Sequence, residues 1–208
     1  MPEIYHCQRD EGWLAARKGK ITASNAAACL GIHPYISRQK AWREITGNLT
    51  PAEKKAQENG QSFAARWGLN FEAVARNAYE AETGNLVTET GLWLHDEVSW
   101  LAASPDGHVN DDIVLECKCL EKVPAKVPFE HRLQCQIQMA CTGRQWAHYW
   151  VWPKPPHTDG NKPTLWVIRR TGMMPTLILL LERFYVEHIL SGVTPLKKPP
   201  KKRKKVKA

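Results

Sequence analysis

Residues 101–118 read LAASPDGHVNDDIVLECK, with two apolar runs on either side of a polar segment. Leu101–Ala103 and Ile113–Leu115 are typical of buried strands, and Asn110–Asp112 supplies turn-forming side chains. We therefore predict a strand hairpin across this segment. The hairpin would fold Asp106 back towards Glu116.

The hairpin would bring together two carboxylates and one ammonium. Glu116 and Lys118 are separated by one residue, so in an extended strand they share one face while Cys117 lies on the other. Burying carboxylates without partners costs several kcal/mol, and a bound cation relieves that cost. Two carboxylates beside an ammonium therefore indicate metal-dependent cleavage of a phosphodiester bond. The same residues also fit a plain turn followed by a solvated strand with an ion pair.

The order of periodic segments indicates an α/β fold. Helices are expected near 10–18, 23–30, 37–46, 52–66, 69–83, 129–142 and 175–190, and strands near 86–90, 99–104, 107–109, 113–119, 147–152 and 164–169. The fifth helix carries Glu72, and we expect Val74, Ala75 and Ala78 on its apolar side.

A second group of polar residues lies near the N-terminus. Thr22 and Ser24 precede an alanine-rich stretch with a glycine stop, which is typical of a capped helix. Free amides and a hydroxyl at the start of a helix, with Arg17 and Lys18 or Lys20 nearby, would form an anion site suited to a terminal phosphate. The residues fit equally well a helix in which Thr22 or Ser24 is only a cap.

The pattern Ser104-Pro105-Asp106-Gly107 followed by Leu115-Glu116-Cys117-Lys118 resembles the core of the PD-(D/E)XK nucleases. Within them it is similar to the phage lambda exonuclease and YqaJ-type viral recombinase branch. Arg17–Ser24, Gly68–Glu72 and Gln134–Gln136 fall in that branch's order, and the resemblance covers about residues 9–152. It implies a restriction-endonuclease-like core with a central mixed sheet flanked by helices.

The resemblance implies a metal site and a catalytic lysine. Asp106, Glu116, the backbone carbonyl of Cys117 and Glu72 would bind the metal. The implied cofactor is Mg²⁺, for which Mn²⁺ could substitute. Lys118 would orient or activate the attacking water.

A glutamine on the helix 129–142 would complete the catalytic set. The resemblance implies that Gln136 positions the nucleophile or the lysine. The broader RecB-like nucleases place a tyrosine four residues later, where Ala140 stands here, and Gln138 offers a competing side chain.

Three residues match the positions that hold a 5′-terminal phosphate in the related exonuclease, namely Arg17, Ser24 and Ser104. Asp96 matches another acidic position of the family, with a minor role expected. Other local contacts to nucleic acid would come from Arg9, and from Trp13 and Trp42 as stacking partners.

The activity implied by the resemblance is 5′-to-3′ exonuclease digestion of linear double-stranded DNA from a 5′-phosphorylated end, in recombination or viral replication. A homotrimer and a single-strand annealing partner are implied on the same grounds. The alternatives are an endonuclease or RNase on the same core, or a catalytically decayed DNA-binding module.

The charge is concentrated at the C-terminal end. The chain of 208 residues carries a net charge of +8, and eight basic residues between Lys197 and Lys207 account for it, leaving 21 basic and 21 acidic residues elsewhere. We expect one domain over 1–194 and a disordered basic tail over 195–208. The tail fits a nuclear address, a phosphate-binding arm or a solvated end, and we favour the first two.

The sequence contains no signal-peptide pattern and no apolar stretch long enough for a membrane span, so an intracellular location is expected. The six cysteines lack paired CxxC spacing and are expected to be reduced thiols in the core. His131 is the histidine nearest the proposed site, and we expect a surface role for it.

Overall fold

The computed structural model describes residues 2–6, 8, 10–58, 63–158 and 160–196, and of these the side chains of 56–58 and 63–70 are left undescribed. Arg9, Cys7 and the tail from Lys197 onwards lie outside these ranges. The division into one domain and a disordered tail therefore stays a prediction.

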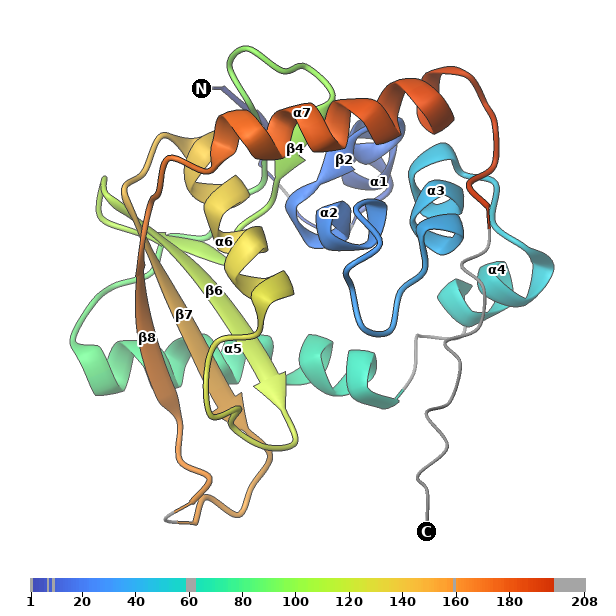
Figure 1. The fold of residues 1–208 in the computed structure, drawn as a ribbon. Helices are drawn as coiled ribbons and strands as arrows, with labels where there is room; N and C mark the ends of the chain where they lie inside the picture. The colour runs from blue at the N-terminus through green and yellow to red at the C-terminus, as the bar shows by residue number, and fades with distance from the viewer. Residues whose placement is uncertain (1, 7, 9, 59–62, 159, 197–208) are drawn as a thin grey trace, which may run out of the picture.

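Strands and helices alternate irregularly along the chain (Figure 1). The strands are β1 (Glu3–Tyr5), β2 (Ile21–Thr22), β3 (Leu92–Leu94), β4 (Leu101–Ala103), β5 (Gly107–Val109), β6 (Ile113–Leu120), β7 (Trp146–Pro153) and β8 (Thr164–Arg169). The helices are α1 (Glu11–Arg17), α2 (Ala23–Cys29), α3 (Arg38–Thr46), α4 (Pro51–Glu58), α5 (Phe63–Thr83), α6 (Phe129–Thr142) and α7 (Met174–Phe184). The last helix continues as a π-helix over Tyr185–Leu190.

The predicted α/β class is confirmed, but the strands form two mixed sheets instead of one central sheet. One sheet has the order β1-β3-β4-β2, and the other has the order β5-β6-β7-β8. In the second sheet, β6 and β7 run parallel while both outer pairs are antiparallel. Glu116 and Lys118 therefore lie on an inner strand of the second sheet, while Asp106 directly precedes β5.

The predicted hairpin is the turn between β5 and β6. Its register pairs Gly107 with Leu115 and Val109 with Ile113. Asn110 adopts a left-handed conformation with φ 51°, which asparagine tolerates better than most residues, and its side chain accepts a hydrogen bond from the Asp112 backbone N–H at 2.9 Å. The hairpin and its turn chemistry were therefore predicted correctly.

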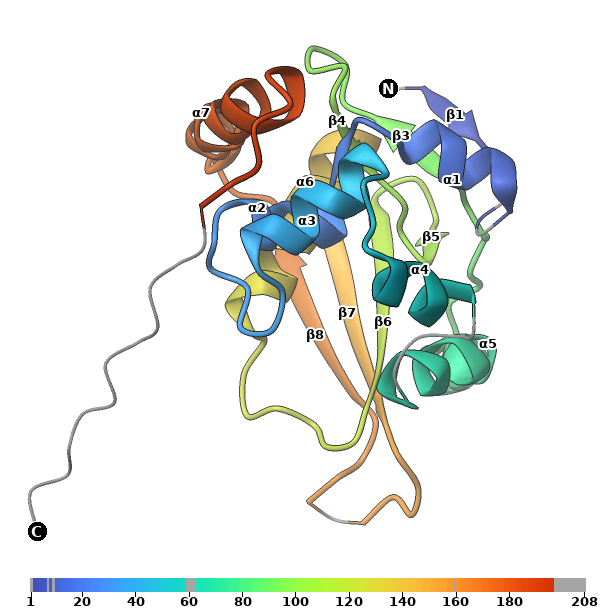
Figure 2. The same ribbon diagram turned by 90° about the vertical axis from the view of Figure 1, so that its right-hand side faces the viewer.

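Two helices cover opposite faces of the β5–β8 sheet (Figure 2). On one face, Val114 and Ala147 pack against Cys135 and Met139 of α6. On the other face, Leu115, Cys117 and Trp150 pack against Ala75 and Tyr79 of α5. Side chains of a strand alternate between faces, so β6 contributes to both layers.

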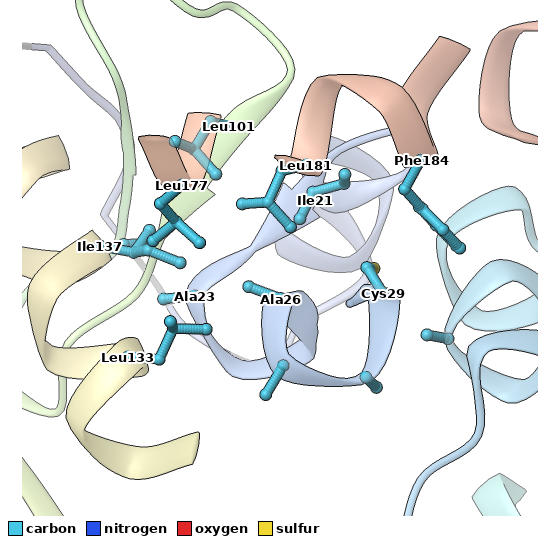
Figure 3. Packing of buried hydrophobic residues seen from close by; sticks show 14 of the residues in the cluster. Ile21, Ala23, Ala26, Cys29, Leu101, Leu133, Ile137, Leu177, Leu181 and Phe184 are labelled. Carbon is cyan, nitrogen blue, oxygen red and sulfur yellow. The ribbon is translucent and has the colours of Figure 1, made fainter. Parts of the chain in front are cut away.

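The largest buried cluster lies on the far side of α6 (Figure 3). Leu133 and Ile137 of α6 face Ala23 and Ala26 of α2, and Leu177 of α7 closes the cluster from above. Each fully buried side chain of this size stabilises the fold by roughly 1.5–3 kcal/mol. Helix α6 is thus held rigidly between the sheet and this cluster.

Several predicted elements differ from those found. Segment 86–90 forms only an isolated bridge between Thr88 and His108, and the short strands β1, β2 and β3 were not predicted. The predicted helices 52–66 and 69–83 are instead α4 and one long α5, which passes through Gly68. A glycine costs a helix only about 1 kcal/mol, which packing against the sheet offsets. Val74 is exposed and does not lie on the apolar side.

Cys29, Cys117, Cys119, Cys135 and Cys141 are free thiols, and all except Cys119 are buried. The prediction of free thiols is confirmed for these five, and the prediction that they lie in the core is confirmed for all of them except Cys119. Among the described residues, none of the helices is both long and apolar enough to cross a membrane.

Candidate active site

The hairpin brings Asp106 beside Glu116. The Asp106 backbone N–H donates to the Leu115 carbonyl at 3.0 Å, and the Cys117 N–H donates to the Asp106 carboxylate at 2.7 Å. Asp106 is therefore fixed against the two neighbours of Glu116 on β6. Both carboxylates lie at the same point of the sheet, as the sequence predicted.

Glu116 is almost completely buried and accepts hydrogen bonds on both oxygens. Its side chain is 2% exposed. Gln134 of α6 donates to Oε1 at 2.7 Å, and Gln138 donates to Oε2. The Lys118 ammonium also donates to Oε1 and forms an ion pair with it. Since every one of these donors comes from β6 or α6, packing of the helix on the strand sets the orientation of the carboxylate.

Glu72 is the third acidic residue near this point. It lies on α5, where its carboxylate is 3.3 Å from Arg76, which also contacts Glu89. Its negative charge reaches Asp106, because it contributes to raising the pKa of that carboxyl. Asp106, Glu116 and Glu72 thus form an acidic cluster drawn from the segment before β5, from β6 and from α5.

The electrostatics of the cluster favour a cation. Burial raises the pKa of Asp106 well above its ordinary value, and the charges of Glu116 and Glu72 raise it further. Burial alone would lower the pKa of Lys118, but Glu116 and Asp106 outweigh that effect and raise it. Lys118 is therefore a charged ammonium that neutralises only part of the cluster.

The donor set fits a hard divalent cation. Within the part of the chain whose side chains are described, no three His, Cys, Asp or Glu side chains are arranged to hold a metal ion. Mg²⁺, however, is held in proteins by one or two carboxylates and keeps several of its waters. Asp106 and Glu116 supply that pair of carboxylates, and their mutual repulsion is the condition that a cation relieves.

A second group of polar side chains links the N-terminal segment to Ser104, two residues before Asp106. Arg17 donates to the hydroxyls of Thr22 at 3.2 Å and Ser24 at 3.3 Å. Its guanidinium carbon lies 4.1 Å from the centre of the Trp13 ring, and the Trp13 indole N–H donates to Ser104 Oγ at 3.1 Å. Of the three residues predicted to hold a phosphate, Arg17 and Ser24 are therefore in contact, and Trp13 links Arg17 to Ser104.

Arg17 is a half-buried cation whose hydrogen-bond partners are neutral. Burial lowers its pKa to about 10, and only the more distant Glu44 opposes that effect. Thr22 is the N-cap residue of α2, and its backbone N–H donates to the Asn25 side-chain oxygen at 2.8 Å. Ser24 does not cap the helix and instead contacts Arg17 and Thr22. This group of side chains has the charge and the donors that an anion requires.

Comparison with known proteins decides the family. The family model for the YqaJ-like viral recombinase domain matches residues 12–145, which include Arg17 and Ser24, the hairpin and the whole of α6. The chain belongs to the YqaJ-like viral recombinase family. No curated protein matches the chain significantly.

Solved structures agree with this family. An alkaline exonuclease from Laribacter hongkongensis, LHK-Exo, is 30% identical with a TM-score of 0.69, over 88% of this chain and 94% of that one. The structure of LHK-Exo in complex with dAMP matches equally well. A phage-related exonuclease from Haemophilus somnus 129PT shares the fold at 16% identity and a TM-score of 0.52, over 91% of this chain and 98% of that one.

The predicted role of Gln136 in this recombinase-family site is not supported. Its amide nitrogen donates to the Arg169 carbonyl at 2.8 Å, and its oxygen accepts from the Thr171 backbone N–H at 2.8 Å. Successive helix residues are rotated by about 100°, so Gln136 points roughly 200° away from Gln134. Gln134 and Gln138, spaced by four, share the face towards Glu116 and donate to its carboxylate.

Two other predicted residues lie apart from the site. The Trp42 indole is buried and donates to the His188 carbonyl at 2.9 Å, so it supports the fold and offers no surface for stacking. Asp96 lies in the loop after β3, where its charge acts on His95 and on Cys141 at the far end of α6.

Proposed function

We propose that this protein is a Mg²⁺-dependent exonuclease that digests linear double-stranded DNA in the 5′-to-3′ direction from a 5′-phosphorylated end. Membership of the viral recombinase family and likeness to an alkaline exonuclease support a DNA exonuclease. One observation carries the finer proposal. Ser104, which the Trp13 indole contacts beside Arg17, lies two residues from Asp106. An anion pocket and an acidic cluster are therefore neighbours.

The acidic cluster would hold the metal. Asp106, Glu116 and the backbone carbonyl of Cys117 would be its ligands, with Glu72 completing the shell directly or through water. When bound, Mg²⁺ polarises the scissile phosphate and lowers the pKa of a coordinated water. Gln134 and Gln138 hold Glu116 in one orientation, so its position does not depend on the cation alone.

Lys118 would act on the attacking water. Its ammonium lies on the same face of β6 as Glu116 and is 24% exposed, so it can meet a water on the solvent side of the cluster. An ammonium carries three N–H donors, of which Glu116 takes one. The remaining donors can orient the water and stabilise charge on the phosphate oxygens.

Arg17 would select the 5′-phosphate. A phosphate placed between its guanidinium and the hydroxyls of Ser24 and Ser104 would replace neutral acceptors by a dianion, which forms stronger, bidentate hydrogen bonds. A chain end bound in this way would bring the next phosphodiester near Asp106. Digestion would then proceed from that end.

The experiment compares three DNA forms with and without Mg²⁺. A linear duplex with 5′-phosphoryl ends should be degraded with Mg²⁺, a 5′-hydroxyl duplex should be degraded much more slowly, and a covalently closed circle should remain intact. A label at the 5′ end should be released before a label at the 3′ end. Nicking of closed circles or degradation of RNA would instead indicate the alternative endonuclease or RNase, and binding without turnover would indicate a decayed module.

Three further features are proposed, two of them on the family resemblance alone. They are a ring-shaped homotrimer and a single-strand annealing partner, together with a nuclear address in the tail after residue 194, which is proposed instead on the eight basic residues of that tail. Mass measurement under active conditions tests the first, since an active monomer would contradict it. Co-purification with an annealing protein and localisation of a chain truncated at residue 196 test the other two.

A further inference from the structure

A tyrosine of β7 lies beside the proposed catalytic pair. The parallel register of β6 and β7 pairs Glu116 with Tyr149, so both side chains point to the α6 face of the sheet. Tyr149 is completely buried, packed with Cys135 and Met139 of α6. Lys118 follows Glu116 on the same face, one diagonal step from Tyr149.

The Tyr149 hydroxyl is held by a histidine from α6. His131 Nδ1 lies 2.6 Å from the hydroxyl oxygen, and the two ring centres are 5.5 Å apart. His131 is half-buried and is not the surface residue that the sequence suggested. It lies one helical turn before Gln134, so α6 presents His131, Gln134 and Gln138 as one polar stripe towards β6 and β7.

Both members of this pair are uncharged near neutral pH and lie within the field of Lys118. Burial lowers the pKa of His131 to about 3, with Lys118 contributing after it. Burial raises the pKa of Tyr149, and Lys118 opposes that rise. A neutral imidazole can accept the phenolic proton, which leaves the lone pairs of the oxygen available to another donor.

We propose that Tyr149 is a positioning residue for Lys118 and that His131 fixes the direction of its hydroxyl. The Lys118 ammonium shares Glu116 Oε1 with the Gln134 amide, so that oxygen already accepts two donors. Tyr149 supplies a second acceptor on the same face. With acceptors on two sides, the ammonium keeps one position beside the acidic cluster.

The chain contains a matched control. On the opposite face of the same sheet, the buried Tyr79 of α5 bonds His148 Nδ1 at 2.5 Å, with ring centres 5.8 Å apart. His148 pairs with Leu115 in the register and faces α5. Tyr79→Phe therefore removes the same type of hydrogen bond from the same sheet without touching the Lys118 face.

The first test is kinetic and rests on the proposed function. Tyr149→Phe should lower kcat about tenfold, the upper range for a lost hydrogen bond, with KM for DNA ends within about twofold of wild type. His131→Asn, whose amide oxygen can accept in place of Nδ1, should retain more activity than His131→Leu. Tyr79→Phe should leave kcat unchanged. A wild-type kcat in Tyr149→Phe, or an equal loss in Tyr79→Phe, would overturn the proposal.

The second test does not require exonuclease activity. Acetylation of Lys118 in metal-free protein, followed by mass spectrometry, should be faster in Tyr149→Phe than in wild type and unchanged in Tyr79→Phe. Equal rates in all three proteins would refute the positioning role even if the enzyme is active. An inactive wild-type protein that shows the acetylation difference would instead refute the proposed function and leave the positioning of Lys118 supported.

Discussion

Replacing Gln138 by methionine should change the free energy of unfolding far less than the same replacement at Gln134. Both amides donate to the Glu116 carboxylate, and each such bond to a charged group contributes about 1.5–3 kcal/mol. The two side chains differ in their other atom. Gln138 Oε1 is buried without a hydrogen-bond partner among the described residues. The Gln134 oxygen does not belong to the buried atoms that lack a partner.

The magnitudes follow from that difference. An unpartnered buried acceptor costs about 1–3 kcal/mol, so Gln138→Met removes a favourable bond and an unfavourable group of similar size. We expect its net effect to lie within about 1.5 kcal/mol of zero. Gln134→Met loses the hydrogen bond but removes no unpartnered buried acceptor. It should therefore be the less stable variant by about 1–3 kcal/mol, or about 2–12 °C in Tm for a domain of this size.

Urea unfolding followed by tryptophan fluorescence gives both values under one set of conditions. Equal slopes of free energy against urea concentration would show that the variants unfold to the same extent. If Gln138→Met proves as destabilising as Gln134→Met, or more so, the unpartnered oxygen has a partner in solution and the reasoning fails.

Lys118→Met should lower kcat by at least about 10²-fold while DNA-end binding in a mobility-shift assay remains close to wild type, because the ammonium acts on the water and not on the end. Arg17→Ala should reduce kcat/KM on 5′-phosphoryl ends by about 10–100-fold but hardly affect 5′-hydroxyl ends, so equal losses on both would contradict a phosphate role. The Arg43 guanidinium lowers the pKa of Glu53 from 4.5 to about 2, and Glu53 also accepts from the Thr50 backbone N–H at 2.9 Å. Because this folded-state pKa lies below the unfolded one, the stabilisation is present above about pH 4.5 and is lost as the pH falls towards 2. Glu53→Gln should thus cost about 1–2 kcal/mol at pH 7, allowing for partial exposure, and urea titrations should show that cost shrinking by pH 3.

The parts of the fold that could be predicted are those with a strong local pattern. Helix α6 and strands β6 and β8 have long periodic segments, and the Asn110 turn has its own side-chain chemistry. The strands β1, β2 and β3 span only two or three residues and exist because partners distant in sequence supply their hydrogen bonds. A local stretch of sequence does not show which distant segment a short strand will pair with.

In the candidate site too, the residues that could be predicted are those set by local sequence, and the others depend on tertiary packing. Asp106, Glu116 and Lys118 lie within one hairpin, so period-two geometry was enough to bring them together. The choice among three glutamines depended on which face of α6 meets β6, and α6 is buried on nearly all sides. Because Leu133–Thr142 of α6 are all buried, the contrast between exposed and buried residues did not show which side of the helix meets β6. The spacing of four between Gln134 and Gln138 was the available clue, since two donors on one face suit a carboxylate with two oxygens.

In strand β6, the packing that stabilises the fold also fixes the positions of the site residues Glu116 and Lys118. Leu115 and Cys117 pack on the α5 face, while Glu116 and Lys118 point to α6. A slip of one residue against β7 would exchange these faces and place both charges in the apolar cluster around Tyr79. Desolvating them there, without the amides of α6, would cost several kcal/mol. The apolar residues of β6 therefore select the one register in which the carboxylate and the ammonium meet their partners.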